Sequence, residues 1–198
     1  MSRALEVVVV NGSPNERSKT GGLADLVTAT LADLLPIEVH HVGVHRLGAS
    51  FTGAVQREDV DAAVEAEIRA VETADVLVAA TPVYRASYSG MFKHFFDLVD
   101  QYALANKPVI LVATGGSDRH ALVIEHELRP LFAFFQAATI PVGFYANAGD
   151  FDGTTVLNNE VYSRIEMGLH DVLPALIRAT EERPAADPDL RDQHGAVT

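Results

Sequence analysis

The sequence predicts an α/β protein in which a parallel sheet is covered by helices on both faces. Several short runs are continuously apolar and rich in valine and isoleucine, as expected of strands that are buried on both sides. Longer segments between them carry apolar residues at helical spacing. Because strands and helices alternate along the chain, the connections must be right-handed crossovers, which gives a three-layer sandwich.

Five apolar runs are the expected strands, namely Leu5–Val10, Ile37–Val42, Val76–Ala80, Val109–Ala113 and Ile140–Tyr145. Five strands favour the flavodoxin-like order 2-1-3-4-5 over a six-stranded Rossmann sheet. In either case ligands bind where the carboxyl ends of the strands meet at the topological switch point. In the flavodoxin-like order, this point is formed by the loops after strands 1, 3 and 4.

Five helices are expected from their apolar stripes, over Leu23–Leu35, Val60–Val71, Met91–Val99, Leu122–Phe135 and Val161–Ile177. Pro130 lies inside the fourth of these patterns and cannot donate a hydrogen bond to the carbonyl of His126. A local break is therefore expected there, either a proline kink or a wider turn.

Length and composition predict one domain. The chain has 198 residues and is 48% hydrophobic, which allows a substantial core. Residues 1–180 are expected to form the domain, and residues 181–198, which are polar and contain proline, a disordered tail.

Composition also excludes several classes of partner and site. A net charge of −12 argues against nucleic acids and anionic membranes, and no apolar run approaches a membrane span. The absence of cysteine excludes disulfides and thiolate chemistry. No signal-peptide pattern precedes the first strand, so a cytoplasmic location is expected.

The loop after the first strand is suited to a phosphate group. It runs from Asn11 to Gly22, is rich in Ser, Thr and Gly, and leads directly into a helix. A helix N-terminus offers unpaired N–H groups and partial positive charge to an anion. The same residues also suit an ordinary turn with Ser18 or Thr20 as the N-cap.

The other two loops complete the pattern of a site for a phosphorylated planar ring. The loop 81–90 offers an apolar and aromatic wall, and the loop 114–120 offers a Gly-Gly pair, which by itself would suit an ordinary turn. Neither the P-loop motif nor the dinucleotide Gly-x-Gly-x-x-Gly motif is present. The eight histidines show no metal-ligand spacing, so no metal is expected. Arg85 and Arg119 could contact nicotinamide phosphates or be solvated.

Three motifs carry a family resemblance: Asn11-Gly12-Ser13-Pro14 with Ser18 and Thr20, the segment Thr81 to Gly90, and Ala113-Thr114-Gly115-Gly116-Ser117 with His120. They resemble the NAD(P)H-dependent FMN reductases, especially the branch that serves two-component alkanesulfonate and methanesulfonate monooxygenases. In that branch, the region of His126 resembles a helix with an inserted residue that forms a π-bulge at a subunit interface. Asn15 stands where many members have an arginine, with Arg17 as the expected replacement.

The resemblance implies FMN and NADPH or NADH as ligands, and a role for each loop. The FMN phosphate would be held by Ser13, Arg17, Ser18, Thr20 and Gly21. The isoalloxazine would be bordered by Pro82, Val83, Tyr84 and Arg85, with N–H groups near Tyr84 and Arg85 facing N5. Its pyrimidine end would face Thr114, Gly115, Gly116 and Ser117. Hydride passes directly from nicotinamide C4 to flavin N5, so no catalytic side chain is expected.

The resemblance also implies partners. The product FMNH2 would be supplied to a flavin-dependent, sulfonate-type monooxygenase. A homodimer or homotetramer is expected, because Leu131, Phe132, Phe134 and Phe135 exceed what one core-facing stripe needs. Three other hypotheses remain open from the residues: an NAD(P)H:quinone or azo reductase that retains its FMN, a flavodoxin-type electron carrier, and a non-catalytic flavin- or nucleotide-sensing module.

Overall fold

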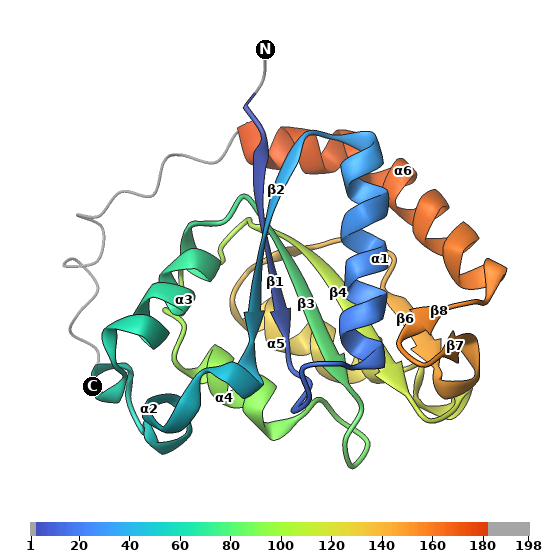
Figure 1. Ribbon diagram of the computed structural model, residues 1–198. Helices are drawn as coiled ribbons and strands as arrows, with labels where there is room; N and C mark the ends of the chain where they lie inside the picture. The colour runs from blue at the N-terminus through green and yellow to red at the C-terminus, as the bar shows by residue number, and fades with distance from the viewer. Residues whose placement is uncertain (1–2, 182–198) are drawn as a thin grey trace.

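The computed structural model describes residues 3–181, and it confirms the predicted fold class. Four long parallel strands make up most of the sheet: β1 (Leu5–Asn11), β2 (Ile37–Gly43), β3 (Val76–Pro82) and β4 (Pro108–Gly115). The sheet order is β2-β1-β3-β4-β5, as predicted, and Figure 1 shows β2, β1, β3 and β4 side by side in this order. The predicted tail, apart from Glu181 at the end of the last helix, lies outside the described residues.

The fifth strand was predicted as one run over residues 140–145, and this prediction is wrong. Two short strands, β5 (Ala138–Thr139) and β6 (Phe144–Asn147), pair in parallel with successive parts of β4. The chain between them contains Pro141, which has no N–H for the ladder. An antiparallel hairpin, β7 (Phe151–Asp152) with β8 (Thr155–Val156), follows and was not predicted.

Helices cover both faces of the sheet (Figure 1). The residues of α1 (Lys19–Leu34) and α6 (Asn159–Glu181) pack on one face. The other face is covered by α3 (Ala62–Thr73), α4 (Gly90–Asp97) and α5 (Arg129–Phe134), with the short unpredicted α2 (Gly48–Gly53) beside them. Short 3-10 turns are η1 (Val44–Arg46), η2 (Arg57–Asp59), η3 (Asp118–His120) and η5 (Ala148–Asp150). Within the described chain, no helix is both long and apolar enough to cross a bilayer.

The edge strand β2 departs from the prediction that all strands are covered on both faces. Its residues 38–41 are exposed, whereas residues 7–10 of the neighbouring β1 are buried. The sequence of β2, with Glu38, His40 and His41 around Val39, already alternates more than a doubly covered strand would. The helices therefore cover the centre of the sheet, where the loops after β1, β3 and β4 begin.

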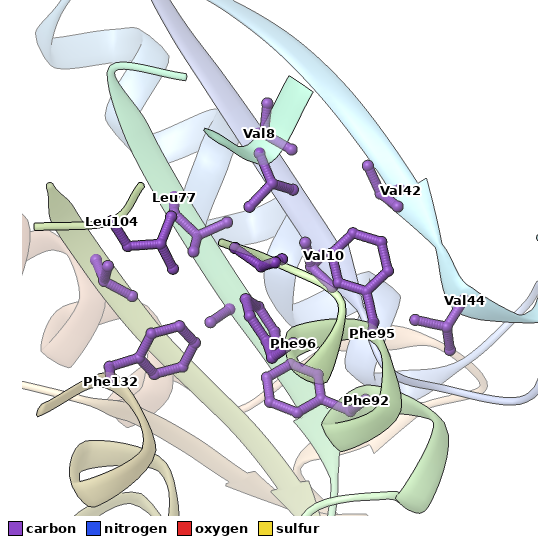
Figure 2. Packing of buried hydrophobic residues seen from close by; sticks show 14 of the residues in the cluster. Val8, Val10, Val42, Val44, Leu77, Phe92, Phe95, Phe96, Leu104 and Phe132 are labelled. Carbon is purple, nitrogen blue, oxygen red and sulfur yellow. The ribbon is translucent and has the colours of Figure 1, made fainter. Parts of the chain in front are cut away.

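Aromatic side chains fill the space between the sheet and the α4–α5 layer. Phe92, Phe96 and Phe132 are all 1% exposed or less, and they lie together beneath the strands (Figure 2). The ring centroids of Phe92 and Phe96 are 4.8 Å apart, and those of Phe96 and Phe132 are 5.0 Å apart in an edge-on arrangement. Burial of a phenylalanine contributes about 1.5–3 kcal/mol. This cluster fixes α4, which carries the loop after β3.

The break expected near Pro130 is a π-helix. η4 (Ile124–Leu128) has π geometry, and α5 follows it with Pro130 in its first turn. Pro130 has no N–H for the helical ladder, so the ladder is interrupted where the π-helix passes into α5. Ile124 and Leu128 are buried, so the wide turn is anchored in the core. This outcome favours the bulge over a simple proline kink.

Candidate functional site

The three predicted loops meet at the carboxyl edge of the sheet. The N–H of Gly12 donates to the Ala80 carbonyl (2.8 Å), which joins the first loop to β3. The N–H of Val83 donates to the Thr114 carbonyl (2.7 Å), which joins the second loop to the third. The hydroxyls of Thr20 and Thr114 lie 2.6 Å apart, which joins the first loop to the third. The three loops, which come from separate segments of the chain, thus lie together at this edge.

The first loop is organised around the N-terminus of α1. Ser18 is the N-cap, and its hydroxyl accepts a hydrogen bond from the Gly21 N–H (3.0 Å). Ser13 is 3% exposed, and its hydroxyl accepts from the N–H of Asn15 (3.2 Å). Arg17 is exposed beside them. The remaining N–H groups of the first helical turn have no preceding carbonyl, so an anion can accept from them.

Two further residues that position this loop were missed in the sequence. The side-chain oxygen of Asn11 accepts from the Ser13 N–H (3.0 Å). The hydroxyl of Ser89, the N-cap of α4, donates to the Gly12 carbonyl (2.6 Å), and the Ser89 N–H donates to the Thr81 hydroxyl (3.1 Å). Ser89 therefore ties the first loop to the second. The sequence could indicate Ser89 as an N-cap, because it stands directly before an apolar helix. It could not indicate the Gly12 carbonyl, which follows the neighbouring strand β1, as the acceptor of the Ser89 hydroxyl.

The second loop contains a tight turn of unusual backbone geometry. Tyr84 and Ser87 exchange two backbone hydrogen bonds, of 2.8 and 3.1 Å. Between them Arg85 and Ala86 have φ of 50° and 71°, values that cost energy for residues with a Cβ. The Tyr84 N–H is thus committed to the turn, so of the two N–H groups expected to face N5, the Arg85 N–H is the one without an acceptor among the described residues. The Tyr84 side chain is 47% exposed.

The third loop is held by Tyr145 at the start of η3. The Tyr145 hydroxyl donates to the Ser117 carbonyl (2.6 Å). Burial, and then the nearby Asp118 and Asp150 carboxylates, raise the pKa of Tyr145 to about 12, so the hydroxyl remains a donor at neutral pH. A Cβ on Gly115 would lie 2.3 Å from this hydroxyl. A side chain at position 115 would therefore displace the Tyr145 hydroxyl. Glycine is favoured here by this close packing and not by backbone conformation, because the φ of Gly115 is not in the left-handed region.

Gly116 is different from Gly115. A Cβ built on Gly116 would meet no heavy atom within 4 Å, and the residue is exposed. The backbone of this loop is thus open on the side where a ligand can approach. Among the described residues, no group of three His, Asp or Glu side chains is arranged to hold a metal ion. The three loops present mainly hydroxyls and backbone amides at this edge of the sheet.

Comparison with known proteins decides the family. Residues 5–152 match the family model described as NADPH-dependent FMN reductase. The chain belongs to this family. It is 47% identical over 169 residues to an NADH-dependent FMN reductase of Pseudomonas putida, covering 85% of this chain and 91% of that protein. It is also 44% identical over 174 residues to an NADH-dependent FMN reductase of Pseudomonas fluorescens, covering 88% and 93% of the two chains.

Solved structures agree with this membership of the FMN reductase family. An oxidoreductase from Corynebacterium diphtheriae superposes with a TM-score of 0.76 at 30% identity, over 92% of this chain and 100% of that one. The apo form of an NADH:FMN oxidoreductase superposes with a TM-score of 0.74 at 27% identity, over 95% and 94%. The protein is therefore an oxidoreductase that uses NAD(P)H and FMN, and the flavodoxin-like fold is confirmed.

The chemistry of the described site fits FMN. The N-terminus of α1 lies next to Thr114, through the contact of Thr20 with Thr114. Two residues after Thr114, the backbone at Gly116 is open. Hydroxyls and N–H groups suit a phosphate, and fixed amides suit a ring that gains electrons. The structure thus brings together the predicted residues of the three loops, and their contacts with FMN remain a prediction.

Proposed function

We propose that this FMN reductase reduces FMN with a nicotinamide dinucleotide and releases FMNH2 to a flavin-dependent monooxygenase, of the kind that acts on sulfonates. The observation that carries the proposal is the junction of three loops at Thr114, where the N-terminus of α1 adjoins the exposed backbone at Gly116. The motifs described above resemble the reductases of two-component sulfonate monooxygenase systems, which supports this class of partner.

In this proposal each loop binds one part of FMN. The N-terminus of α1, with Ser13, Arg17, Ser18, Thr20 and Gly21, binds the phosphate. The isoalloxazine lies along Pro82, Val83 and Tyr84, with the free N–H of Arg85 directed at its edge. Thr114, Gly115, Gly116 and Ser117 face the pyrimidine end, where their amides stabilise the negative charge of reduction.

The reacting atoms belong to the two ligands, so the protein contributes by orientation. FMN accepts a hydride at N5 from nicotinamide C4, and no side chain needs to take or give a proton in that step. The residues hold the ring flat against the loops and leave one face open for the nicotinamide. We propose NADH as the preferred donor, because both relatives named above are described as NADH-dependent.

A single assay tests the proposal. NADH and NADPH oxidation are followed with purified protein, with and without added FMN. We expect little oxidation without FMN, a rate that rises with added FMN, and a larger kcat/KM for NADH. FMN that copurifies in stoichiometric amount and supports quinone or azo-dye reduction without added flavin would instead indicate the retained-cofactor enzyme. A bound flavin that no nicotinamide reduces would indicate an electron carrier.

We further propose that the chain assembles as a homodimer or homotetramer through the α4–α5 face. Of the four apolar residues expected to exceed one core-facing stripe, Phe132 and Phe135 are buried, whereas Phe134 is 65% exposed. A groove of about 490 Å³ lies beside Phe134, between α4 and α5. Exposed apolar groups around a groove are typical of an interface.

A further inference from the structure

The turn Tyr84–Ser87 is strained, yet few contacts hold it in place. Arg85 and Ala86 are both in the left-handed region, at φ of 50° and 71°. Glycine and asparagine favour such a turn, whereas alanine does not. A strained backbone persists where the surrounding structure determines it. Some group outside the turn is therefore expected to stabilise this conformation.

Anchors at both ends of the loop do not reach its tip. Val83 is fixed by its hydrogen bond to the Thr114 carbonyl, and Ser89 is fixed by its bonds to Gly12 and Thr81. Between these anchors, the side chains of Tyr84, Arg85 and Ala86 are exposed. The tip thus depends on the two backbone bonds of the turn and on what Ser87 contacts.

The Ser87 hydroxyl donates to the carboxylate of Glu127 over 2.8 Å. Glu127 lies in the π-helix η4, between the buried Ile124 and Leu128. The neighbouring Arg129 donates to Glu125 and to the carbonyl of Ile140, so this wide turn is tied to the segment after β5. Glu127 is therefore a charged acceptor on a firmly anchored element, and bonds of this kind are stronger than neutral ones.

We propose that Glu127 is a positioning residue, which through Ser87 holds the Tyr84–Ser87 turn in the left-handed geometry that presents the Arg85 N–H to the flavin. In this role Glu127 acts on the flavin site through Ser87, to which it is hydrogen-bonded. The inference rests on the proposed placement of the isoalloxazine against Pro82–Tyr84. It assigns a role to the π-helix within one subunit: the wide turn carries the acceptor for Ser87.

The test compares Glu127→Ala with Glu127→Gln and Ser87→Ala in the full chain. Loss of the acceptor is expected to weaken FMN binding about tenfold, which corresponds to about 1.4 kcal/mol. The glutamine keeps an acceptor oxygen and should restore most of the affinity. Because Ser87 and Glu127 act as one unit, the double variant Ser87→Ala with Glu127→Ala should bind FMN no more weakly than either single variant does.

Glu125→Ala is the matched control. Glu125 lies in the same π-helix and pairs with Arg129, but it does not contact the turn. This variant should lower the melting temperature and leave FMN affinity unchanged. If Glu125→Ala and Glu127→Ala weaken FMN binding equally, Glu127 acts only through the stability of the π-helix, and the proposal is overturned.

Amide hydrogen exchange separates the turn from the flavin. Without FMN, the Tyr84 and Ser87 amides should exchange faster in Glu127→Ala than in wild type. Adding Ala86→Gly, which removes the strain at φ 71°, should reverse much of the loss in FMN affinity. Unchanged exchange overturns the proposal, and so does faster exchange with unchanged FMN affinity. In the second case, intact FMN-dependent NADH oxidation would show that the proposed function stands while the positioning role fails.

Discussion

Ser18 has one observed task at the start of α1 and one proposed task. It caps the helix by accepting from the Gly21 N–H, and we propose that it binds the FMN phosphate. Ser18→Ala should reduce FMN affinity by about tenfold or more, because a hydrogen bond to a charged group contributes about 1.5–3 kcal/mol. Riboflavin, which lacks the phosphate, should be affected far less. Fluorescence titration with both flavins measures the difference.

The control for this variant is another N-cap. Asp61 caps α3 by accepting from the N–H groups of Ala63 and Val64, so Asp61→Ala should cost about 1 kcal/mol of stability. It should not change FMN affinity. Equal weakening of FMN and riboflavin by Ser18→Ala would place the phosphate elsewhere.

At the same scale, the sequence predicts the role of a residue best when its hydrogen-bond partner is a near neighbour in the chain. Ser18 was predicted because a hydroxyl stands directly before a helical pattern. Ser89 and Glu127 were missed because their partners lie 77 and 40 residues away in the chain. Long-range side-chain pairs depend on how elements pack, and one sequence does not carry that information.

At the scale of elements, Arg57 joins η2 to α3. Its guanidinium donates to Glu65 through two nitrogens, each at 2.9 Å, and to Glu72, whose side chain is 2% exposed. The hydrogen bonds from Arg57 hold the pKa of Glu65 below its usual range. A lowered carboxyl pKa stabilises the folded state above the unfolded pKa, and this contribution is lost as the pH falls through the folded value.

Arg57→Leu should therefore destabilise the protein more at pH 7 than at pH 3. At pH 7 we expect a loss of about 1.5–3 kcal/mol, because the hydrogen bonds from Arg57 to the Glu65 and Glu72 carboxylates are lost. Urea unfolding at the two pH values measures both losses. Arg69→Leu is the control, since Arg69 pairs with the same Glu65 but is 58% exposed, and it should change stability by under about 1 kcal/mol. An equal loss at both pH values would contradict the assignment to Glu65.

The elements that prediction missed are short and carried local signals. Pro141 marks the gap between β5 and β6, and Asp152-Gly153 marks the turn of the β7–β8 hairpin, where Gly153 has φ 58°. β1, β3 and β4 were recognisable because burial on both faces makes them continuously apolar. Two-residue strands have no periodicity to detect, so their pairing emerges only from the packed structure.

At the scale of the whole molecule, the order of strands decided where the site would be found. The loops after β1, β3 and β4 come from three distant parts of the chain, and the topology alone brings them to one edge. This is why the meeting of the three loops could be predicted, whereas the long-range contacts between them could not. Assembly is a property of the same scale, and it depends on the side chains that the fold leaves exposed.

Phe134 and the groove between α4 and α5 predict a self-associating face. Leu131, Phe96 and Phe135 line the groove, and Phe134 at its rim is 65% exposed. Light scattering at micromolar concentration should give a mass two or four times the 21.3 kDa of the chain. Phe134→Ser should shift this mass toward the monomer, because the apolar area that drives association is reduced.

Leu157→Ser provides the comparison that makes this result specific. Leu157 is 62% exposed, so it presents a similarly exposed apolar side chain, but it lies between β8 and α6, away from the α4–α5 groove. Its substitution should leave the mass unchanged. A wild-type monomer, with and without FMN, would rule out assembly through any face. An oligomer that Phe134→Ser does not weaken would assign the interface to a different surface, and the exposed face of β2 would then be the next to test.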